Sequence, residues 1–195
     1  MTDLLFEIGT EEIPASYITP ALNQIKTLFT ERAEKHRLEL HSLYFTGTPR
    51  RFTVFVKGLP QKQESITEEI QGPAASIAFD KTGNPTKAGL GFAKSQGVDI
   101  QNLQIKKTSK GEYCIAIKKV EGREALHILP EILTEIIRNI SFPKSMKWKG
   151  NNLFFARPIR SILTLFGDKV VPMEINGIKA DKFTFGHPFL SGKTI

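Results

Sequence analysis

Basic and aromatic side chains alternate in one stretch of this sequence, from Arg138 to Arg160. No Asp or Glu lies between Glu135 and Asp168. The stretch holds Arg138, Lys144, Lys147, Lys149, Arg157 and Arg160, interleaved with Phe142, Trp148, Phe154 and Phe155. Lys and Arg contact phosphates, and exposed aromatic rings stack on unpaired bases. The pattern therefore favours contact with a nucleic acid. The alternative is a solvated basic surface, and Phe154 and Phe155 are expected in the core, because Phe is usually buried.

Arg50 and Arg51 form a second basic group, directly after the turn at Pro49. Guanidinium groups match phosphate oxygens in a bidentate fashion. Neighbouring strand residues point to opposite faces, so the two arginines are not expected to grip one phosphate. One of them can instead hold a carboxylate of the segment from Glu7 to Glu12, and both interpretations stay open.

Three glutamates, Glu7, Glu11 and Glu12, lie close together near the N-terminus. Clustered carboxylates can bind metals or act as acid and base. We favour a local structural role, because Glu11 and Glu12 precede an expected helix whose N-terminal dipole attracts negative charge. Thr10 is expected to cap that turn. A third possibility is an interface with a basic partner surface.

Other catalytic and cofactor patterns are weak. His187 is interpreted as a hydrogen-bonded turn residue rather than a catalytic base, and no nucleophile lies in a recognisable triad setting. Gly89-Leu90-Gly91 lacks the context of a phosphate loop, and its small residues are expected to allow close packing. The single Cys114 excludes an internal disulfide and a Cys-based zinc site, and we predict no metal site.

The composition is that of a globular protein, with 195 residues, 40% of them hydrophobic and 24% charged. Residues 1–100 carry 11 Lys and Arg against 12 Asp and Glu, whereas residues 101–195 carry 16 against 8. The net charge of +7 thus comes from the second half, which favours an anionic partner. No apolar run reaches the ~18 residues of a membrane helix, and the N-terminus lacks a signal-peptide pattern. We expect a cytoplasmic protein with no membrane contact.

The first elements are expected to be a strand over 3–8 and a helix that begins at Pro14 or Pro20 and ends near His36. If the helix begins at Pro20, Thr19 would cap it. Two strands follow over 40–45 and 52–57, with Phe52, Val54 and Val56 on one face.

The middle of the chain predicts a separate module. A polar connector is expected over 59–69, then a short helix over 84–96 ended by Gly97, then a hairpin of strands 103–107 and 112–119. We therefore predict a sub-module over residues 66–120, inserted into a larger domain.

The remaining elements are a helix over 123–140 with a broad apolar face, and strands over 162–166, 170–175 and 182–185, with a turn at Gly167-Asp168. The order predicts an α+β fold, in which a mixed or antiparallel sheet is packed by two main helices.

Six short motifs resemble, in order and spacing, the N-terminal part of the β subunit of bacterial heterotetrameric glycyl-tRNA synthetase. They are Phe6-Glu7-Ile8-Gly9-Thr10-Glu11-Glu12-Ile13-Pro14, Thr48-Pro49-Arg50-Arg51-Phe52, Gly72-Pro73-Ala74, Phe142-Pro143-Lys144-Ser145-Met146-Lys147-Trp148, Phe155-Ala156-Arg157-Pro158-Ile159-Arg160 and Gly186-His187-Pro188-Phe189. Family β subunits are much longer, so the resemblance implies an N-terminal fragment covering residues 1–195.

The resemblance implies an enzyme that attaches glycine to its tRNA with ATP and magnesium. Two α subunits would supply the class II active site, and two β subunits most of the tRNA recognition. This segment would then hold no catalytic residue and would contact the tRNA, the α subunit or both. The expected RNA contacts are Lys144, Lys147, Lys149, Arg157, Arg160, Arg50, Arg51 and Trp148. The alternatives are a docking domain without RNA contact, and an editing or hydrolytic domain that uses Glu7, Glu11, Glu12 or His187.

Overall fold

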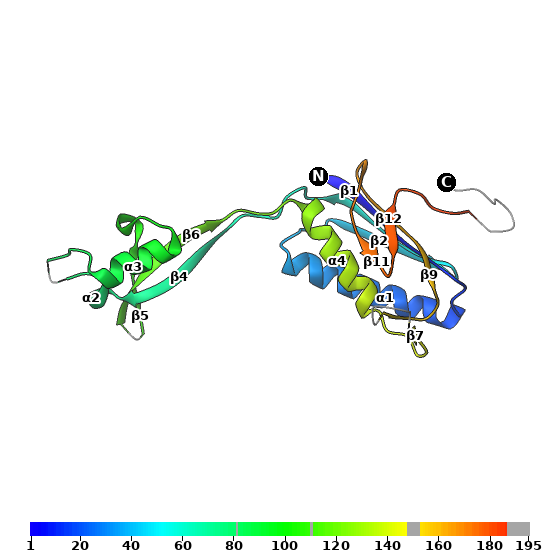
Figure 1. Cartoon of the computed structure of the whole chain (residues 1–195), viewed down its shortest axis with the longest axis horizontal. Coiled ribbons are helices and arrows are strands. Elements are labelled where there is room, and N and C mark those ends of the chain that lie inside the picture. Colours follow the sequence, from blue (N-terminus) through cyan, green and yellow to red (C-terminus); the bar gives the residue numbers. More distant parts are fainter. Residues whose placement is uncertain (81, 110, 148–152, 187–195) are drawn as a thin grey trace. The chain divides into compact units, whose positions relative to one another are not determined.

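A computed structural model describes residues 1–80, 82–109, 111–147 and 153–186. The chain divides into two compact units (Figure 1). Unit 1 consists of Met1–Gln63 together with Arg123–Ile195, and unit 2 is the insertion Glu64–Gly122. The sub-module expected over 66–120 lies within the bounds of unit 2.

The elements of unit 1 are β1 Thr2–Thr10, α1 Ala15–Lys35, β2 Ser42–Thr48, β3 Arg51–Leu59, α4 Ala125–Asn139, β7 Met146–Lys147, β8 Phe154–Phe155, β9 Ile159–Phe166, β10 Lys169–Val170, β11 Glu174–Ile175 and β12 Ile178–Asp181. The elements of unit 2 are β4 Ile66–Ala74, α2 Ala75–Ala78, α3 Lys87–Gln96, the 3₁₀ turn η1 Ile100–Asn102, β5 Gln104–Thr108 and β6 Gly111–Val120. Within the described residues, no helix combines the length and the apolar character needed to cross a bilayer.

The main sheet of unit 1 is built around β1. Its strand order is β11-β12-β9-β1-β3-β2, and β10 also pairs with β9. β3 and β9 flank β1, and both are antiparallel to it, whereas β12 runs parallel to β9. The sheet is therefore mixed, and the α+β prediction is confirmed.

Alternation along the strands gives the sheet one buried face. Leu4, Phe6 and Ile8 of β1 are at most 1% exposed, and their register partners on β3 include Phe52 and Val54, which are equally buried. Successive strand residues point to opposite faces, so these side chains share one side of the sheet. The expected face of Phe52, Val54 and Val56 is confirmed.

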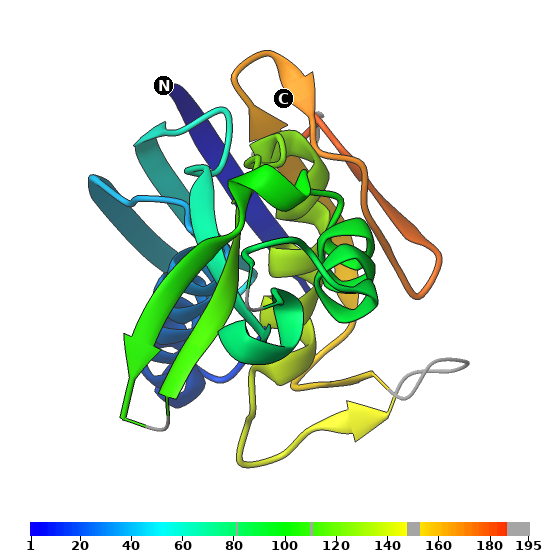
Figure 2. The same cartoon turned by 90° about the vertical axis from the view of Figure 1, so that its left-hand side faces the viewer.

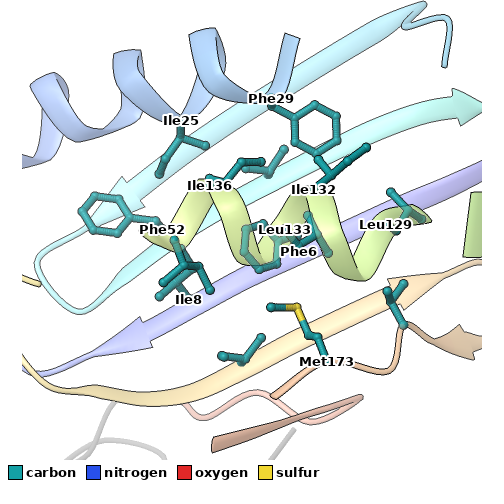
Figure 3. Packing of buried hydrophobic residues seen from close by; sticks show 14 of the residues in the cluster. Phe6, Ile8, Ile25, Phe29, Phe52, Leu129, Ile132, Leu133, Ile136 and Met173 are labelled. Atoms are coloured by element: carbon teal, nitrogen blue, oxygen red, sulfur yellow. The ribbon is translucent and has the colours of Figure 1, made fainter. Parts of the chain in front are cut away.

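Helices α1 and α4 complete this core. α1 buries Ile25 and Phe29, and α4 buries an apolar stripe that includes Ile132 and Ile136. Figure 3 shows these side chains meeting Phe6, Ile8 and Phe52 from the sheet, and all belong to one cluster of buried residues. At about 25 cal/mol per Å² of buried apolar surface, this shared face is the main source of stability for unit 1.

The opposite face of the main sheet, which we call the outer face, carries Leu5, Glu7 and Gly9 of β1. The strand register aligns Leu5 with Phe55 on β3 and Leu165 on β9. Tyr44 of β2 lies beside Phe55, with ring centroids 6.2 Å apart, and is 58% exposed. The outer face thus has an apolar row in its middle and the charged residues Glu7 and Arg51 toward one end.

Unit 2 is a three-stranded antiparallel sheet, β4-β6-β5, with short helices packed against it. Figures 1 and 2 show α2 and α3 beside its strands. Thr86 caps α3 by accepting a hydrogen bond from the Gly89 N–H, and Gly97 ends the helix in the left-handed region at φ 68°. The predicted end of the helix at Gly97 and the predicted hairpin, now β5 and β6, are confirmed.

Of the two starts predicted for the first helix, the one at Pro14 is confirmed. α1 begins at Ala15, directly after Pro14, so Pro20 lies inside the helix and Thr19 does not cap it. The polar connector predicted over 59–69 was wrong over its last residues, because β4 begins at Ile66. The sequence of β4 is polar where Thr67, Glu68 and Glu69 are exposed to solvent. The amino-acid composition therefore did not reveal this strand.

The last strands also differ from the prediction. The strand expected over 170–175 is two short strands, β10 and β11, on either side of Pro172, which has no N–H for a ladder. No strand forms over residues 182–185. The last strand is β12, which pairs with β9 and ends at Asp181, just before the expected strand would begin. Asn176 and Gly177, both with positive φ, form the tight β11–β12 turn. An Asn-Gly pair is the strongest short hairpin signal, so this turn was visible in the sequence.

Two glycines of α3 give a matched test of packing in unit 2. A Cβ on Gly89 would overlap the Ala78 carbonyl oxygen, whereas a Cβ on Gly91 would meet nothing within 4 Å. Gly91→Ala should stabilise the protein by about 0.5–1 kcal/mol through helix propensity, and Gly89→Ala should destabilise it. Urea unfolding monitored by far-UV circular dichroism would measure both. Equal effects would mean that α3 does not pack on the Ala78 backbone.

Candidate functional site

Three segments meet at one end of the outer face: the end of β1, the turn before β3 and the start of β9. Their backbones are joined by three hydrogen bonds. Thr10 N–H donates to the Arg50 carbonyl at 2.9 Å, Ile13 N–H to Pro49 at 2.7 Å, and Glu11 N–H to Pro158 at 2.9 Å. These bonds place the acidic residues of the first segment beside the arginines of the other two.

Each glutamate of the cluster holds an arginine. Arg51 Nε lies 3.4 Å from Glu7 Oε2, and Arg50 Nη2 lies 3.3 Å from Glu12 Oε2. Nε and Nη2 of Arg160 both lie 2.6 Å from Glu11 Oε1. Arg157 joins through its Nε, which donates to the Glu12 carbonyl at 3.2 Å. We call the six residues Glu7, Glu11, Glu12, Arg50, Arg51 and Arg160 the ion-pair cluster.

Glu7 is the buried member of the ion-pair cluster, with 6% of its surface exposed. A buried carboxylate is costly unless it is paired and hydrogen-bonded. Besides Arg51, the Thr184 hydroxyl donates to Glu7 Oε1, and Arg51 Nη2 donates to the Phe185 carbonyl. Glu7 and Arg51 together therefore fasten the segment around Thr184 and Phe185 to the sheet.

A small cavity of about 170 Å³ lies within the ion-pair cluster. It is lined by Glu7, Gly9, Thr10, Glu11, Arg50, Arg51, Arg160, Ser161, Phe185 and Gly186. Gly9 is required at its base, because a Cβ there would overlap Ser161 Oγ. A second cavity of about 450 Å³ shares four lining residues with the first, namely Arg50, Arg51, Phe185 and Gly186.

Thr10 contributes a buried polar atom to this site. Its hydroxyl oxygen is inaccessible and has no hydrogen-bond partner within the described residues, although buried hydroxyls are nearly always paired. Thr10 does not cap α1, contrary to the sequence prediction, because the helix begins only at Ala15 and its cap residue is Pro14. The first turn of α1 also contains no acidic residue, so the helix-dipole explanation for Glu11 and Glu12 was wrong.

The sequence left open whether one arginine of the pair holds a carboxylate. In the structure both Arg50 and Arg51 do so, and Arg160 does as well. Ser161 and Thr184 were not predicted as site residues, since only the strand register and the last described segment bring them here. No group of three His, Cys, Asp or Glu side chains in the described part of the chain could hold a metal ion.

The other predicted site lies on the short hairpin of β7 and β8. The register pairs Lys147 with Phe154 and Met146 with Phe155. Lys144, Lys147, Met146 and Phe154 are all exposed, and Phe154 has 51% of its surface accessible. The prediction that Phe154 lies in the core was wrong, whereas Phe155 is fully buried, as predicted. Trp148, Lys149 and His187 lie outside the described residues.

Aromatic packing fixes the base of this hairpin. Phe155 meets Phe142 edge to face, with ring centroids 4.8 Å apart, and Phe142 lies 6.2 Å from the ring of Tyr17 on α1. Because adjacent strand residues face opposite ways, burying Phe155 turns Phe154 outward. Figures 1 and 2 show the β7 segment extending beyond the C-terminal end of α4. We call Lys144, Met146, Lys147 and Phe154 the exposed hairpin patch.

The two groups of basic residues differ in how free they are to bind an anion. A phosphate at Arg51 would compete with Glu7, and displacing the buried Glu7 carboxylate from Arg51 leaves an uncompensated charge. Lys144 and Lys147 have no carboxylate partner within the described residues and are exposed. The exposed hairpin patch is therefore the better phosphate surface.

Arg51 and Arg50 give a matched test of the ion-pair cluster. Arg51→Ala should destabilise the protein by roughly 2–4 kcal/mol, because it leaves the buried Glu7 without its cation. Arg50→Ala should cost less than about 1 kcal/mol, because the Arg50–Glu12 pair is largely exposed. Chemical denaturation at neutral pH measures both, and equal losses would contradict the special role of Glu7.

Two buried threonines test whether the Thr10 hydroxyl is unpaired. Thr164 is fully buried and its hydroxyl donates to the Val171 carbonyl at 2.9 Å. Thr164→Val should cost about 1–2 kcal/mol, whereas Thr10→Val should be neutral or stabilising by up to about 1 kcal/mol. Thermal unfolding of the two variants beside the parent protein would show the difference. A comparable loss for Thr10→Val would mean that its hydroxyl has a partner in solution.

Comparison with known proteins identifies the family of this chain. Residues 4–195 match the family described as "Glycyl-tRNA synthetase beta subunit". The "Glycine--tRNA ligase beta subunit" of Syntrophomonas wolfei is 49% identical over 189 residues, which cover 97% of this chain and 28% of that protein. The proteins of the same name from Moorella thermoacetica and Clostridioides difficile are 44% and 43% identical, with 27% and 28% of their lengths covered. The chain spans little more than a quarter of these relatives, and it belongs to the glycyl-tRNA synthetase beta subunit family.

Proposed function

We propose that this chain is a non-catalytic, tRNA-binding and assembly part of a glycine–tRNA ligase. The intact enzyme would attach glycine to its tRNA in the cytoplasm at the expense of ATP. Activation of glycine, with ATP and magnesium, is assigned to a partner α subunit in an α2β2 assembly. Membership of the β subunit family supports the reaction class, and the surface chemistry of unit 1 supports the RNA contact.

The observation that carries the RNA contact is the exposed hairpin patch. It presents two ammonium groups and one aromatic ring on a short hairpin, next to a C-terminal helix end that also carries the exposed Arg138. Lysines contribute affinity by releasing counterions from phosphates, without reading sequence. An exposed Phe offers a face on which an unpaired base can stack. Together they suit an RNA segment in which paired and unpaired nucleotides adjoin.

We expect the arginines near the start of β9 to contribute less to RNA binding than the two lysines. Arg157 precedes β9 and Arg160 is its second residue. Both are exposed, but both contact the backbone or carboxylate of the segment from Glu11 to Glu12. Their contribution to RNA binding would require rearrangement of those contacts. Lys144 and Lys147 need no such rearrangement, so we expect them to dominate the affinity.

Subunit docking is the second candidate function, and one observation favours it. The apolar row on the outer face, Tyr44, Phe55, Leu5 and Leu165, is only half-buried or exposed. Contiguous apolar surface of this kind is typical of protein interfaces. Binding of the isolated α subunit that is lost in Tyr44→Ser, with RNA affinity absent, would favour docking over RNA binding.

The RNA contact is tested by removing the two lysines together. Lys144→Ala/Lys147→Ala should weaken tRNA binding and lower the slope of log K against log salt concentration by about 1.4–1.8 in magnitude. The matched control is Lys118→Ala/Lys119→Ala, which removes the same charge from exposed positions of β6 in unit 2. Fluorescence anisotropy with labelled tRNA at several salt concentrations gives both quantities.

Phe154→Ala separates stacking from electrostatics in the same assay. It should cost about 1–3 kcal/mol of RNA binding if a base stacks there, and leave the salt slope unchanged. If both the lysine and the Phe154 variants remain folded and bind tRNA like the parent protein, the hairpin is not the RNA surface.

A further inference from the structure

Asn176 and Gly177 form a reactive pair that the RNA proposal does not use. This is the one place in the sequence where glycine follows asparagine, and each of the other asparagines precedes a residue with a side chain. The backbone nitrogen of the next residue can attack an asparagine side chain, and a glycine hinders this attack least because it has no Cβ. Asn176 is therefore the asparagine of this chain that is best placed to lose its amide.

The pair forms the tip of the β11–β12 hairpin (Figure 1). Ile175 and Ile178 are register partners, so the turn between them has two residues. Asn176 and Gly177 have φ values of 51° and 82°, in the left-handed region that a two-residue hairpin turn requires. Gly177 is exposed, so the residue that supplies the attacking nitrogen is open to solvent, where a base can take its proton.

The fold does not hold the amide of Asn176. Its nitrogen, Nδ2, is buried and has no hydrogen-bond partner within the described residues, although buried polar side chains are nearly always paired. Loss of this nitrogen as ammonia therefore breaks no hydrogen bond that the structure describes. By comparison, Nδ2 of Asn139 donates to the Glu135 carbonyl at 2.7 Å, so that amide is held in place.

The β11–β12 hairpin is short. β11 has two residues and β12 has four, and the Ala180 N–H of β12 donates to the Met173 carbonyl at 2.9 Å. A two-stranded hairpin is marginal by itself, and short elements open locally at a small cost in free energy. Opening lets the backbone of Asn176 leave the left-handed region, so that the Gly177 nitrogen can reach the side-chain carbonyl carbon.

We propose that Asn176 is a site of spontaneous deamidation, and that its isoaspartate product loosens residues 182–186 from the ion-pair cluster. The Gly177 nitrogen attacks Cγ of Asn176. A bond forms between these two atoms, the Cγ–Nδ2 bond breaks, and ammonia leaves with the proton of the Gly177 nitrogen. Water then opens the cyclic imide. Opening at Cγ gives aspartate, and opening at the main-chain carbonyl gives isoaspartate, in which the backbone runs through the former side chain. No atom is oxidised or reduced.

The two products differ in their effect on the turn. Aspartate tolerates the left-handed region much as asparagine does, so it keeps the turn. Isoaspartate adds one carbon to the backbone of a two-residue turn, which breaks the register of Ile175 with Ile178. The change then reaches β12, which pairs with β9 through Ala180 and Asp181.

β12 leads directly to residues 182–186, which are held at the ion-pair cluster. The Thr184 hydroxyl donates to Glu7, and Arg51 donates to the Phe185 carbonyl. A β12 that has lost its register cannot keep both contacts aligned, so isoaspartate at position 176 loosens this segment. The change accumulates with the age of the molecule. It does not depend on RNA binding, because the exposed hairpin patch shares none of these residues.

Ageing of the folded 195-residue chain at mildly alkaline pH tests the modification. After digestion with trypsin, mass spectrometry of the peptide 170–179 should show the amide replaced by an acid. Protein L-isoaspartate methyltransferase should label the same peptide. The rate should rise with pH, because base removes the proton from the Gly177 nitrogen. Asn84 is a negative control, because Pro85 has no N–H, and Asn139 is a slow control.

The folded and unfolded chains should react at different rates. We expect deamidation of Asn176 in the folded chain to be about ten- to a hundredfold slower than in urea, because the turn must open first. Conversion of Asn176 no faster than that of Asn139 in the folded chain would overturn the site. Conversion in urea with none in the folded chain would overturn it as well, since the reaction would then belong to the unfolded state.

Asn176→Gly is the matched control for the effect on the segment, because glycine keeps the positive φ and carries no amide. Amide NMR of the aged parent chain should show new signals for Thr184 and Phe185, with the intensity of the isoaspartate fraction. Aged Asn176→Gly should show none, and Asn176→Asp, which has the sequence of the other product, should leave both signals unchanged. Unaltered signals despite a measured isoaspartate fraction, or the same new signals in aged Asn176→Gly, would refute the coupling to the ion-pair cluster.

Discussion

The alternation of side chains along β1 is the constraint on which the rest of unit 1 depends. Leu4, Phe6 and Ile8 point to the helices and form the centre of the core, so Leu5, Glu7 and Gly9 must point to the outer face. β1 pairs with β3 on one side and β9 on the other, and a register shift of one residue would bury Glu7 among apolar side chains. The burial of the core thus fixes where the charged site lies.

Strand register also determines which charged residues lie close enough to form ion pairs. Arg51 lies opposite Gly9 in the register, so its side chain runs diagonally to Glu7. Gly9 has no side chain, so Ser161 Oγ lies over it, and Gly9, Arg51 and Ser161 all line the cavity. Ion pairs at the rim are exposed and contribute little energy, whereas the Glu7 pair is enclosed and orders the segment at Thr184 and Phe185. Alternate residues of β1 therefore pack in the core on one face of the sheet and form ion pairs on the other.

The exposed hairpin patch follows from a second case of alternation. Phe155 is buried against Phe142, which turns its neighbour Phe154 outward, and Lys147 lies opposite Phe154 in the register. The proposed RNA surface on β7–β8 thus lies apart from the ion-pair cluster, which is built from the ends of β1, β3 and β9.

The sequence by itself determined the fold class, the helix over 123–140 with its apolar face, the core face of β3 and the hairpin of β5 and β6. These features depend on the spacing of apolar residues within one element and on the turn residues beside it, and both are local in the sequence. It also determined the family, through six motifs in order. Only the tertiary structure decided that Arg50, Arg51 and Arg160 hold glutamates, since those partners are 38 to 149 residues apart and meet through strand register. The same holds for Phe154, whose exposure depends on the contacts of its neighbour Phe155, and for the Thr10 hydroxyl, which has no partner within the described residues. Burial and hydrogen-bond satisfaction are properties of the packed chain.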